Sequence, residues 1–132
     1  MSDSGQAVQQ AVFTSINDNP DLAHLFKPVA GGRAELPRVD FDGLETRPHA
    51  GGVTGLFRHE ISFLVWSDFY QMADGLKVFD DIKKTFDGVE LTLDGHRCVD
   101  CRFTGMKAGR AKADRVWQIV VQFDCVTEED AS

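Results

Sequence analysis

The sequence predicts an α+β protein in which a mostly antiparallel sheet carries its helices on one face. Apolar residues recur at helical spacing near the N-terminus and again in the middle of the chain, whereas apolar and polar residues alternate strictly in the segments between and after them. A strand that alternates in this way needs cover on one side only, which is typical of antiparallel sheets. The expected order of elements is α(α)ββαβββ.

Two helices of unequal length are expected at the N-terminus. The first spans about residues 5–17, with Ser4 as its N-cap. Pro20 follows Asn19 as a first helical position follows an N-cap, so a short second helix begins there. The apolar residues of the two helices, which together form one stripe for a sheet, are Ala7, Val8, Ala11, Val12 and Ile16, then Leu22, Leu25 and Phe26.

Two strands are expected next, over about residues 38–42 and 56–66. Residues 46–55 are rich in glycine and carry a proline, so they are expected to form a mobile loop between the strands. In the second strand, Phe57, Ile61, Phe63 and Val65 alternate onto the core face, opposite Arg58, Glu60 and Ser62.

The clearest helix of the sequence follows, with Ser67 and Asp68 as its cap and Gly88 at its C′ position. Its expected buried face consists of Phe69, Met72, Ala73, Leu76, Phe79, Ile82 and Phe86.

Three strands are expected to complete the sheet, over residues 89–93, 96–104 and 115–126. Asp94 and Gly95 form a strong two-residue hairpin signal between the first two. The inward residues of the last two strands are Val99, Cys101 and Phe103, then Trp117, Ile119, Val121, Phe123 and Cys125. A basic loop over about residues 105–114 and a frayed tail from about 127 are expected. The exposed face suits a subunit contact and carries Arg58, Glu60, Asp100, Arg102, Gln118, Gln122 and Asp124.

The length and composition of the chain indicate one globular domain over residues 1–132. Hydrophobic residues make up 42% and charged residues 27%, as in ordinary folded proteins. The net charge of −7 disfavours a dedicated nucleic-acid binder and adhesion to an anionic membrane. No apolar run approaches the roughly 20 residues that span a bilayer, and no secretory signal is visible, so the protein is expected to be made in the cytoplasm.

No constellation in the sequence points to an enzyme, a metal site or a cofactor. Cys98 and Cys101 have C-x-x-C spacing but fall in an expected strand, so one should face the core and the other solvent. With Cys125 they are interpreted as reduced cysteines without a redox or metal role. His59 and Glu60 begin like a zinc-protease motif, but Phe63 occupies the second histidine position. His59 is instead expected to be a satisfied histidine near the edge of the sheet.

Charge is segregated along the chain. Between Arg102 and Arg115 there are five basic residues and one acid, whereas acidic residues gather at Asp74, Asp80, Asp81, Asp87, Glu90 and Asp94. The basic segment is either a solvated turn or an arm that contacts an acidic neighbouring subunit or a DNA backbone. Surfaces of opposite charge favour head-to-tail contacts, which close into rings when the rotation allows.

Several segments resemble a known family, the phage tail-completion or tail-terminator proteins, including those of gene transfer agents. The similarity covers nearly the whole chain. Its residues are Gln9–Ile16, Leu22–Phe26, the run His59–Ser67 with its Val-Trp-Ser step into a helix, Tyr70 and Ala73, Val89–Leu93, Asp94-Gly95-His96 and Trp117–Phe123. The segment Met106–Lys112 departs from the family's turn, so loop contacts do not transfer.

The resemblance implies a structural virion protein without catalytic residues. Such a protein would form a ring, usually a hexamer, that caps the head-proximal end of a tail tube, ends tube polymerisation and joins tail to head. Its partners would be its own copies, the tail-tube protein and a head-side connector or stopper, with DNA only passing through the lumen and no membrane. The protein would assemble in the cytoplasm and end in the neck of the particle.

The sequence leaves alternatives for both the function and the contact residues. Another ring of the head–tail connector, such as a stopper, is the second reading, and a small ligand-binding or hydrolytic domain is the third. Trp66 is either a packing anchor or part of a subunit interface. The residues expected to contact a subunit or partner are Trp66, Arg102, Lys107, Arg110, Lys112 and Arg115.

Overall fold

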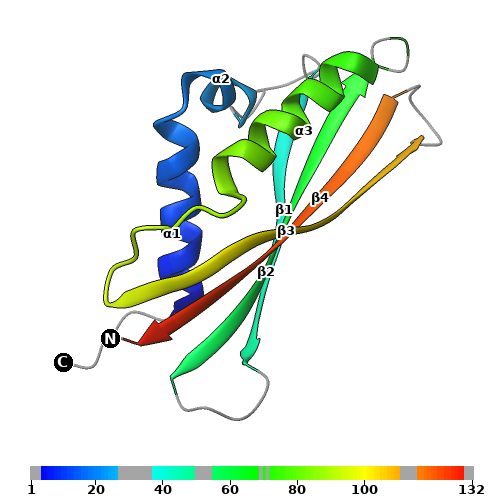
Figure 1. The fold of residues 1–132 in the computed structure, drawn as a ribbon. Helices are drawn as coiled ribbons and strands as arrows, with labels where there is room; N and C mark the ends of the chain where they lie inside the picture. Colours follow the sequence, from blue (N-terminus) through cyan, green and yellow to red (C-terminus); the bar gives the residue numbers. More distant parts are fainter. Residues whose placement is uncertain are drawn as a thin grey trace.

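A single antiparallel sheet forms the body of the protein, with all of its helices on one face (Figure 1). The structure is a computed structural model that describes residues 4–26, 37–49, 55–68, 70, 72–110 and 116–129. Its elements are α1 (Ser4–Asn17), α2 (Pro20–Ala23), the 3-10 turn η1 (His24–Phe26), β1 (Arg38–Pro48), β2 (Leu56–Asp68), α3 (Met72–Phe86), β3 (His96–Arg110) and β4 (Val116–Glu129). The strand order is β1-β2-β4-β3. The predicted fold class is confirmed, with four described strands where five were expected.

Phe63 in β2 lies at the centre of the core. Its ring, which is fully buried, lies 5.4 to 6.1 Å from the rings of Phe26, Phe41, Phe86 and Phe123. These four rings come from η1, β1, α3 and β4, so one side chain joins most layers of the fold. Three of these ring pairs are edge-to-face and the pair with Phe86 is stacked, and such pairs add about 0.5–1.5 kcal/mol each beyond the burial of their area.

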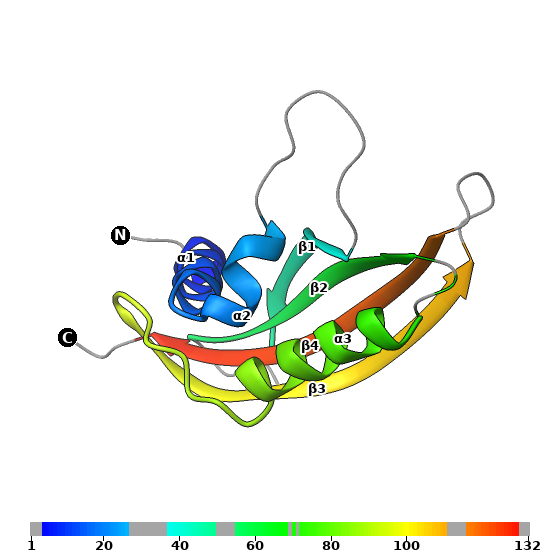
Figure 2. The same ribbon diagram turned by 90° about the horizontal axis from the view of Figure 1, so that it is seen from above.

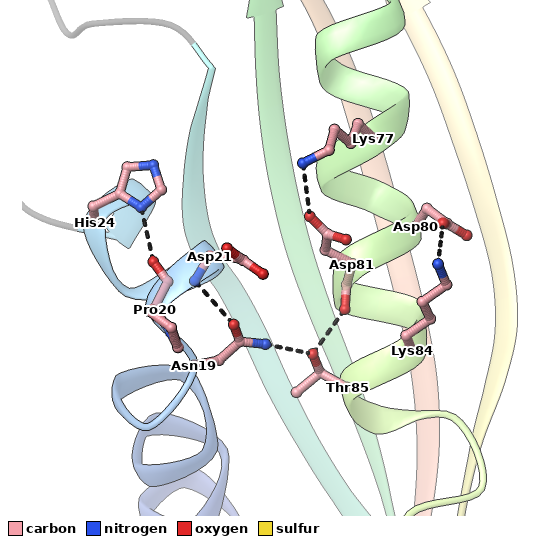
Figure 3. Close-up of polar contacts among 9 residues, drawn as sticks. All are labelled: Asn19, Pro20, Asp21, His24, Lys77, Asp80, Asp81, Lys84 and Thr85. Atoms are coloured by element: carbon pink, nitrogen blue, oxygen red, sulfur yellow. Dashed lines mark hydrogen bonds and ion pairs between the residues drawn. The ribbon is translucent and has the colours of Figure 1, made fainter.

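The N-terminal helices match their predicted positions. All five predicted apolar residues of α1 are buried, although α1 begins at Ser4 itself, so that Ser4 lies in the first turn instead of preceding it. Asn19 caps α2 as predicted, because its Oδ1 accepts a hydrogen bond from the Asp21 N–H at 3.0 Å. Its Nδ2 donates to Thr85 Oγ1 at 3.2 Å, which ties α2 to the last turns of α3 (Figure 3).

The middle helix starts later than predicted, and its buried face agrees with the prediction in part. Ile82 and Phe86 are buried and Met72 and Phe79 pack against the core, as predicted. Ser67 and Asp68 end β2, and Asp68 Oδ1 accepts a hydrogen bond from the Tyr70 N–H at 2.9 Å in the connection to α3. Ala73 and Leu76 are exposed, and Phe69 lies outside the described residues. The buried residues of α3 are Gly75, Val78, Ile82 and Phe86.

Gly75 explains why Ala73 and Leu76 are turned away from the sheet. A Cβ atom at this position would lie 2.6 Å from Ser67 Cβ, closer than two carbon atoms approach each other, and at a tight 3.1 Å from Ile119 Cδ1. The helix therefore lies directly on β2 at this point, and the residue without a side chain has to face the strand. At the other end Gly88 has a φ of 72°, so the predicted C′ glycine is confirmed.

The first strand is longer than predicted. β1 continues to Pro48, which lies opposite Phe57, so residues 46–48 belong to the sheet and not to a loop. Pro48 is tolerated because β1 is an edge strand, where a missing N–H need not break a ladder. The rest of the expected mobile loop, residues 50–54, lies outside the described residues.

The segment before β3 also differs from its prediction. Val89–Leu93 does not form a strand, and only Thr92 makes a single bridge, to Arg97. The predicted turn is present, since this bridge brackets Asp94 and Gly95, and Gly95 has a φ of 76°.

A β-bulge changes the faces of the cysteines. The register of β3 against β4 shifts between Cys98 and Asp100, which leaves Val99 with 47% of its surface exposed. Cys98 and Cys101 consequently both point into the core, with 3% and 1% exposed. The prediction that they face opposite sides, and that Val99 faces inward, was therefore wrong.

The last two strands run past their predicted ends. β3 continues through Gly105 to Arg110, so most of the expected basic loop is strand, and residues 111–115 lie outside the description. β4 continues to Glu129, whose N–H donates to Gly55 O at 3.0 Å. Thr127 is fully buried, so the tail expected to fray from about 127 is part of the sheet as far as Glu129.

We predict that Gly75→Ala destabilises the protein. Overpacking a core typically costs about 1–3 kcal/mol, which exceeds the roughly 1 kcal/mol that alanine gains over glycine inside a helix. The melting temperature should fall. Adding Ser67→Gly, which removes the atoms in the way, should recover part of the loss. A melting temperature of Gly75→Ala at or above that of the wild type would show that the helix does not lie on β2 so closely.

Candidate functional site

The sheet face opposite the helices, called the outer face here, carries the polar residues predicted for it. Directly opposed residues in an antiparallel pair share a face, and Glu60, Asp124 and Arg102 lie side by side across β2, β4 and β3. Ser62 and Gln122 form the next row, and Trp66 and Gln118 a further one. The predicted set of outward residues is confirmed.

One end of the outer face holds charges that pair with one another. Arg58 donates a hydrogen bond to Asp124 and forms an ion pair with it, and Arg102 Nε lies 2.6 Å from Asp100 Oδ2. Arg97 reaches Glu128 at 2.9 Å. Exposed pairs of this kind contribute little to stability. Their effect is that Arg102, one of the predicted contact residues, already has an acidic partner within its own subunit.

The other end of the outer face is apolar. Leu64 and Val120 lie opposite each other on β2 and β4, and Trp66 lies next to them; these three residues are called the apolar strip here. All three are half-buried although the helices lie on the opposite side of the sheet. Trp66 Nε1 donates to Asp40 Oδ2 at 2.9 Å, and the Arg38 guanidinium lies 5.3 Å from the Trp66 ring centre. Trp66 is therefore held in place from β1, with its ring available on the surface.

The sequence analysis found Trp66 but missed Leu64 and Val120. Each of them sits between two core residues of a strand, so alternation alone places it outward, and that was the available signal.

The last part of the edge strand β3 replaces most of the predicted basic loop. This segment, residues 105–110, is called the arm here; it pairs with β4, which pairs in turn with β2 over the same stretch. Figure 2 shows this end of β3 projecting past α3. Lys107 lies opposite Val120, which puts it on the outer face beside the apolar strip. Arg110 ends β3 opposite Trp117, whereas Lys112 and Arg115 lie outside the described residues. The structure thus places Trp66 and Lys107 on the outer face at the two sides of the apolar strip, and leaves Arg102 at the charged end.

The free edge of β3 is covered only over part of its length. Gly88 N donates to Cys101 O at 2.7 Å, and Phe103 N donates to Asp87 Oδ1 at 2.9 Å. Past Phe103, no described residue pairs with this edge. Unpaired backbone groups on an edge strand are a template for another strand.

An acidic hollow lies where α2 meets the last turns of α3 (Figure 3). It is open, has a volume of about 490 Å³, and is lined by Ser15, Asp18, Asn19, Pro20, Asp21, Asp81, Lys84 and Thr85. Lys84 Nζ lies 3.0 Å from Asp80 Oδ2, and this hydrogen bond and the charge of Asp80 raise the pKa of Lys84. Lys77 reaches Asp81 at 3.8 Å. Asp18 and Asp21 add two further carboxylates to the rim of the hollow.

The titratable groups of the described residues suggest no reaction centre. His59 is fully buried, with Nδ1 2.9 Å from Thr46 Oγ1 and Nε2 2.8 Å from Thr127 Oγ1, so the prediction of a satisfied histidine is confirmed. Its predicted place near the edge of the sheet was wrong, because β2 is an inner strand. Among the described residues, no three histidine, cysteine or acidic side chains are arranged to hold a metal ion. None of the helices found there has both the length and the apolar character that crossing a membrane requires.

Comparison with known proteins agrees with the resemblance seen in the sequence. The chain is similar over 93% of its length to a chain from a structure described as the virion of a native gene transfer agent particle, with a TM-score of 0.79, 22% sequence identity and 96% of that chain covered. At this identity the similarity establishes a shared fold. No curated protein sequence matches the chain.

A family model described as "Tail completion protein gp17" matches residues 10–128, nearly the whole chain. This span includes all four strands and both long helices except the first turns of α1. The protein therefore belongs to the tail completion protein gp17 family and is a structural component of a phage-like tail.

Proposed function

We propose that this protein forms a ring that caps the head-proximal end of a tail tube, ends tube polymerisation and joins the tail to the head. Membership of a tail completion family supports this role, and so does the shared fold with a chain of a gene transfer agent virion. The ring is proposed to be a hexamer of this chain between the tail-tube protein and a head-side connector, with DNA passing only through its lumen.

The observation that carries the proposal is the separation of two unlike surfaces. The apolar strip lies on the outer face at the level of the first turn of α3, where Gly75 meets Ser67 and Ile119, and the arm continues from there. The acidic hollow lies at the last turns of α3 (Figure 1). A subunit with different surfaces at its two ends makes heterologous contacts, which close into a ring when the rotation between subunits allows. We assign the arm of one copy to the acidic hollow of the next, because the arm segment is basic and the hollow is rimmed by carboxylates.

A head-side stopper ring remains the second candidate, since it needs the same kind of subunit contacts. A ligand-binding or hydrolytic domain has less support. The described pockets are open hollows on the surface, and none gathers a nucleophile, a base and a base-orienting group.

We predict that deletion of the gene gives DNA-filled heads without attached tails, together with free tubes of irregular length. A missing cap removes both the stop to tube growth and the docking face. Electron microscopy of the particles measures both effects. Tubes of normal length that fail only to attach would favour the stopper, and normal tailed particles would end the proposal.

Trp66→Ala should impair assembly more than folding. The Trp66 side chain is half-buried, so the variant should lose less folding stability than the about 3–5 kcal/mol that truncation of a fully buried tryptophan typically costs. Melting temperatures report folding, and complementation of the deletion strain reports assembly. Phe41→Ala is the matched control, because Phe41 is a half-buried aromatic residue on the core face of the sheet, away from the outer face and the arm. Equal assembly defects per folded protein in both variants would remove the interface role of Trp66.

Reversal of the arm's charge is predicted to block assembly and leave the monomer folded. The variant is Lys107→Glu with Arg110→Glu and Lys112→Glu, which opposes the acidic hollow by like charge. The control is Lys107→Arg with Arg110→Lys and Lys112→Arg, which keeps the charge and should assemble. If the glutamate variant forms tailed particles as well as the wild type does, the arm does not dock by charge.

A further inference from the structure

Three cysteine side chains meet on the core face of the paired strands β3 and β4. Cys98 Sγ lies 3.6 Å from Cys125 Sγ, and Cys101 lies directly opposite Cys125 in the strand register. All three are nearly or fully buried. The cluster exists because the bulge at Val99 turns Cys98 to the same face as Cys101.

Among the pockets described for the visible part of the chain, one is lined by Cys98 and none by Cys101 or Cys125. This open pocket has a volume of about 380 Å³ and is lined by Glu90, Leu91, Thr92, Leu93, His96, Arg97 and Cys98. The irregular segment before β3 thus leaves an open pocket beside Cys98, the residue of the cluster that lies nearest to this segment. Cys101 and Cys125 lie behind it and do not line the described pockets.

The surroundings of the cluster assign different roles to two of its thiols. A hydrogen bond from the Cys125 thiol lowers the pKa of Cys98, with help from the backbone N–H groups of Leu91 and Asp100 and against burial and the Glu90 charge. The pKa of Cys125 is raised, because it is hydrogen-bonded to Cys101 and Cys98 and is buried. A thiolate is the reactive form of cysteine, so Cys98 is the nucleophile of the pair and Cys125 keeps its proton.

We propose that Cys98 and Cys125 form a reactive dithiol that closes to a disulfide on contact with a small disulfide compound. The Cys98 thiolate attacks one sulfur of that compound, forms a mixed disulfide and releases one small thiolate. Cys125 then loses its proton, and its sulfur attacks Cys98 Sγ and releases the second small thiolate. The protein gives up two protons and two electrons, and the small disulfide is reduced to two thiols.

The bridge would join the edge strand β3 to the inner strand β4 across a chain separation of 27 residues. A crosslink of this kind restricts the unfolded chain and stabilises the sheet at its edge. Disulfides persist outside the reducing cytoplasm. If the protein is part of a particle as proposed above, the dithiol would therefore close after release from the cell. The chemistry itself is independent of ring formation and is testable on the isolated chain.

The test uses the purified full chain, reduced and then freed of reductant, with one equivalent of 4,4′-dithiodipyridine as the probe. The expected result is release of two equivalents of 4-thiopyridone, a mass loss of two hydrogen atoms, and a Cys98–Cys125 crosslinked peptide. The melting temperature should rise and return to its starting value after addition of dithiothreitol. Cys125→Ser should stop at the mixed disulfide on Cys98, with one equivalent of 4-thiopyridone released.

Cys101→Ala is the matched control, since it removes a neighbouring buried thiol and should leave the crosslink intact. Three outcomes would overturn the proposal. They are no release of 4-thiopyridone without denaturant, a first crosslink that contains Cys101, and equally fast reaction of all three thiols. Because the readouts are mass and absorbance of the monomer, they are unaffected if the ring proposal fails.

Discussion

The contact of one phenylalanine ring with four others holds the layers of this protein together. Phe63 is buried in the middle of β2, and its partners come from η1, β1, α3 and β4. Because these contacts are all on one face of the sheet, every helix gathers there. The opposite face has no helix to cover it, and this leaves the apolar strip and its charged surroundings on the surface. The one-sided core is thus the reason that a surface for assembly exists.

Helices and strands of equal residue number have very different lengths, and the arm follows from this difference. α3 and β3 both contain 15 residues. A helix of this size is about 22 Å long, whereas a strand spans about 50 Å. The helical layer therefore ends before the sheet does, and the edge strand β3 continues past it into the arm, where residues 106–108 are exposed. The same strand has its edge closed by Asp87 and Gly88 in the covered part, which confines the open edge to the arm.

Irregularities in β3 have consequences beyond their own positions. The bulge at Val99 exposes a valine and gathers three cysteines that strict alternation would have separated. A second register shift lies between Phe103 and Gly105, where the covered body of the sheet becomes the arm. Bulges bend and twist a strand locally. In this protein the first bulge creates the thiol cluster, and the second marks the start of the exposed arm.

The sequence by itself determined the features that depend on neighbouring residues along the chain. The Asn19 cap, the Gly88 helix end and the turn at Asp94-Gly95 rest on local backbone chemistry, and the alternating faces of β2 and β4 follow from the geometry of any extended strand. The fold class and the outward position of Trp66 could be predicted on these grounds, whereas the family was predicted from the resemblance of several segments to known sequences. Only the tertiary structure decided which face of α3 is buried, because the close contact between Gly75 and Ser67 outweighs the apolar character of Leu76. It also decided the shared face of Cys98 and Cys101 and the extension of β1, β3 and β4, because a strand's bulges and length depend on the partner that completes its hydrogen bonds, and that partner is distant in sequence.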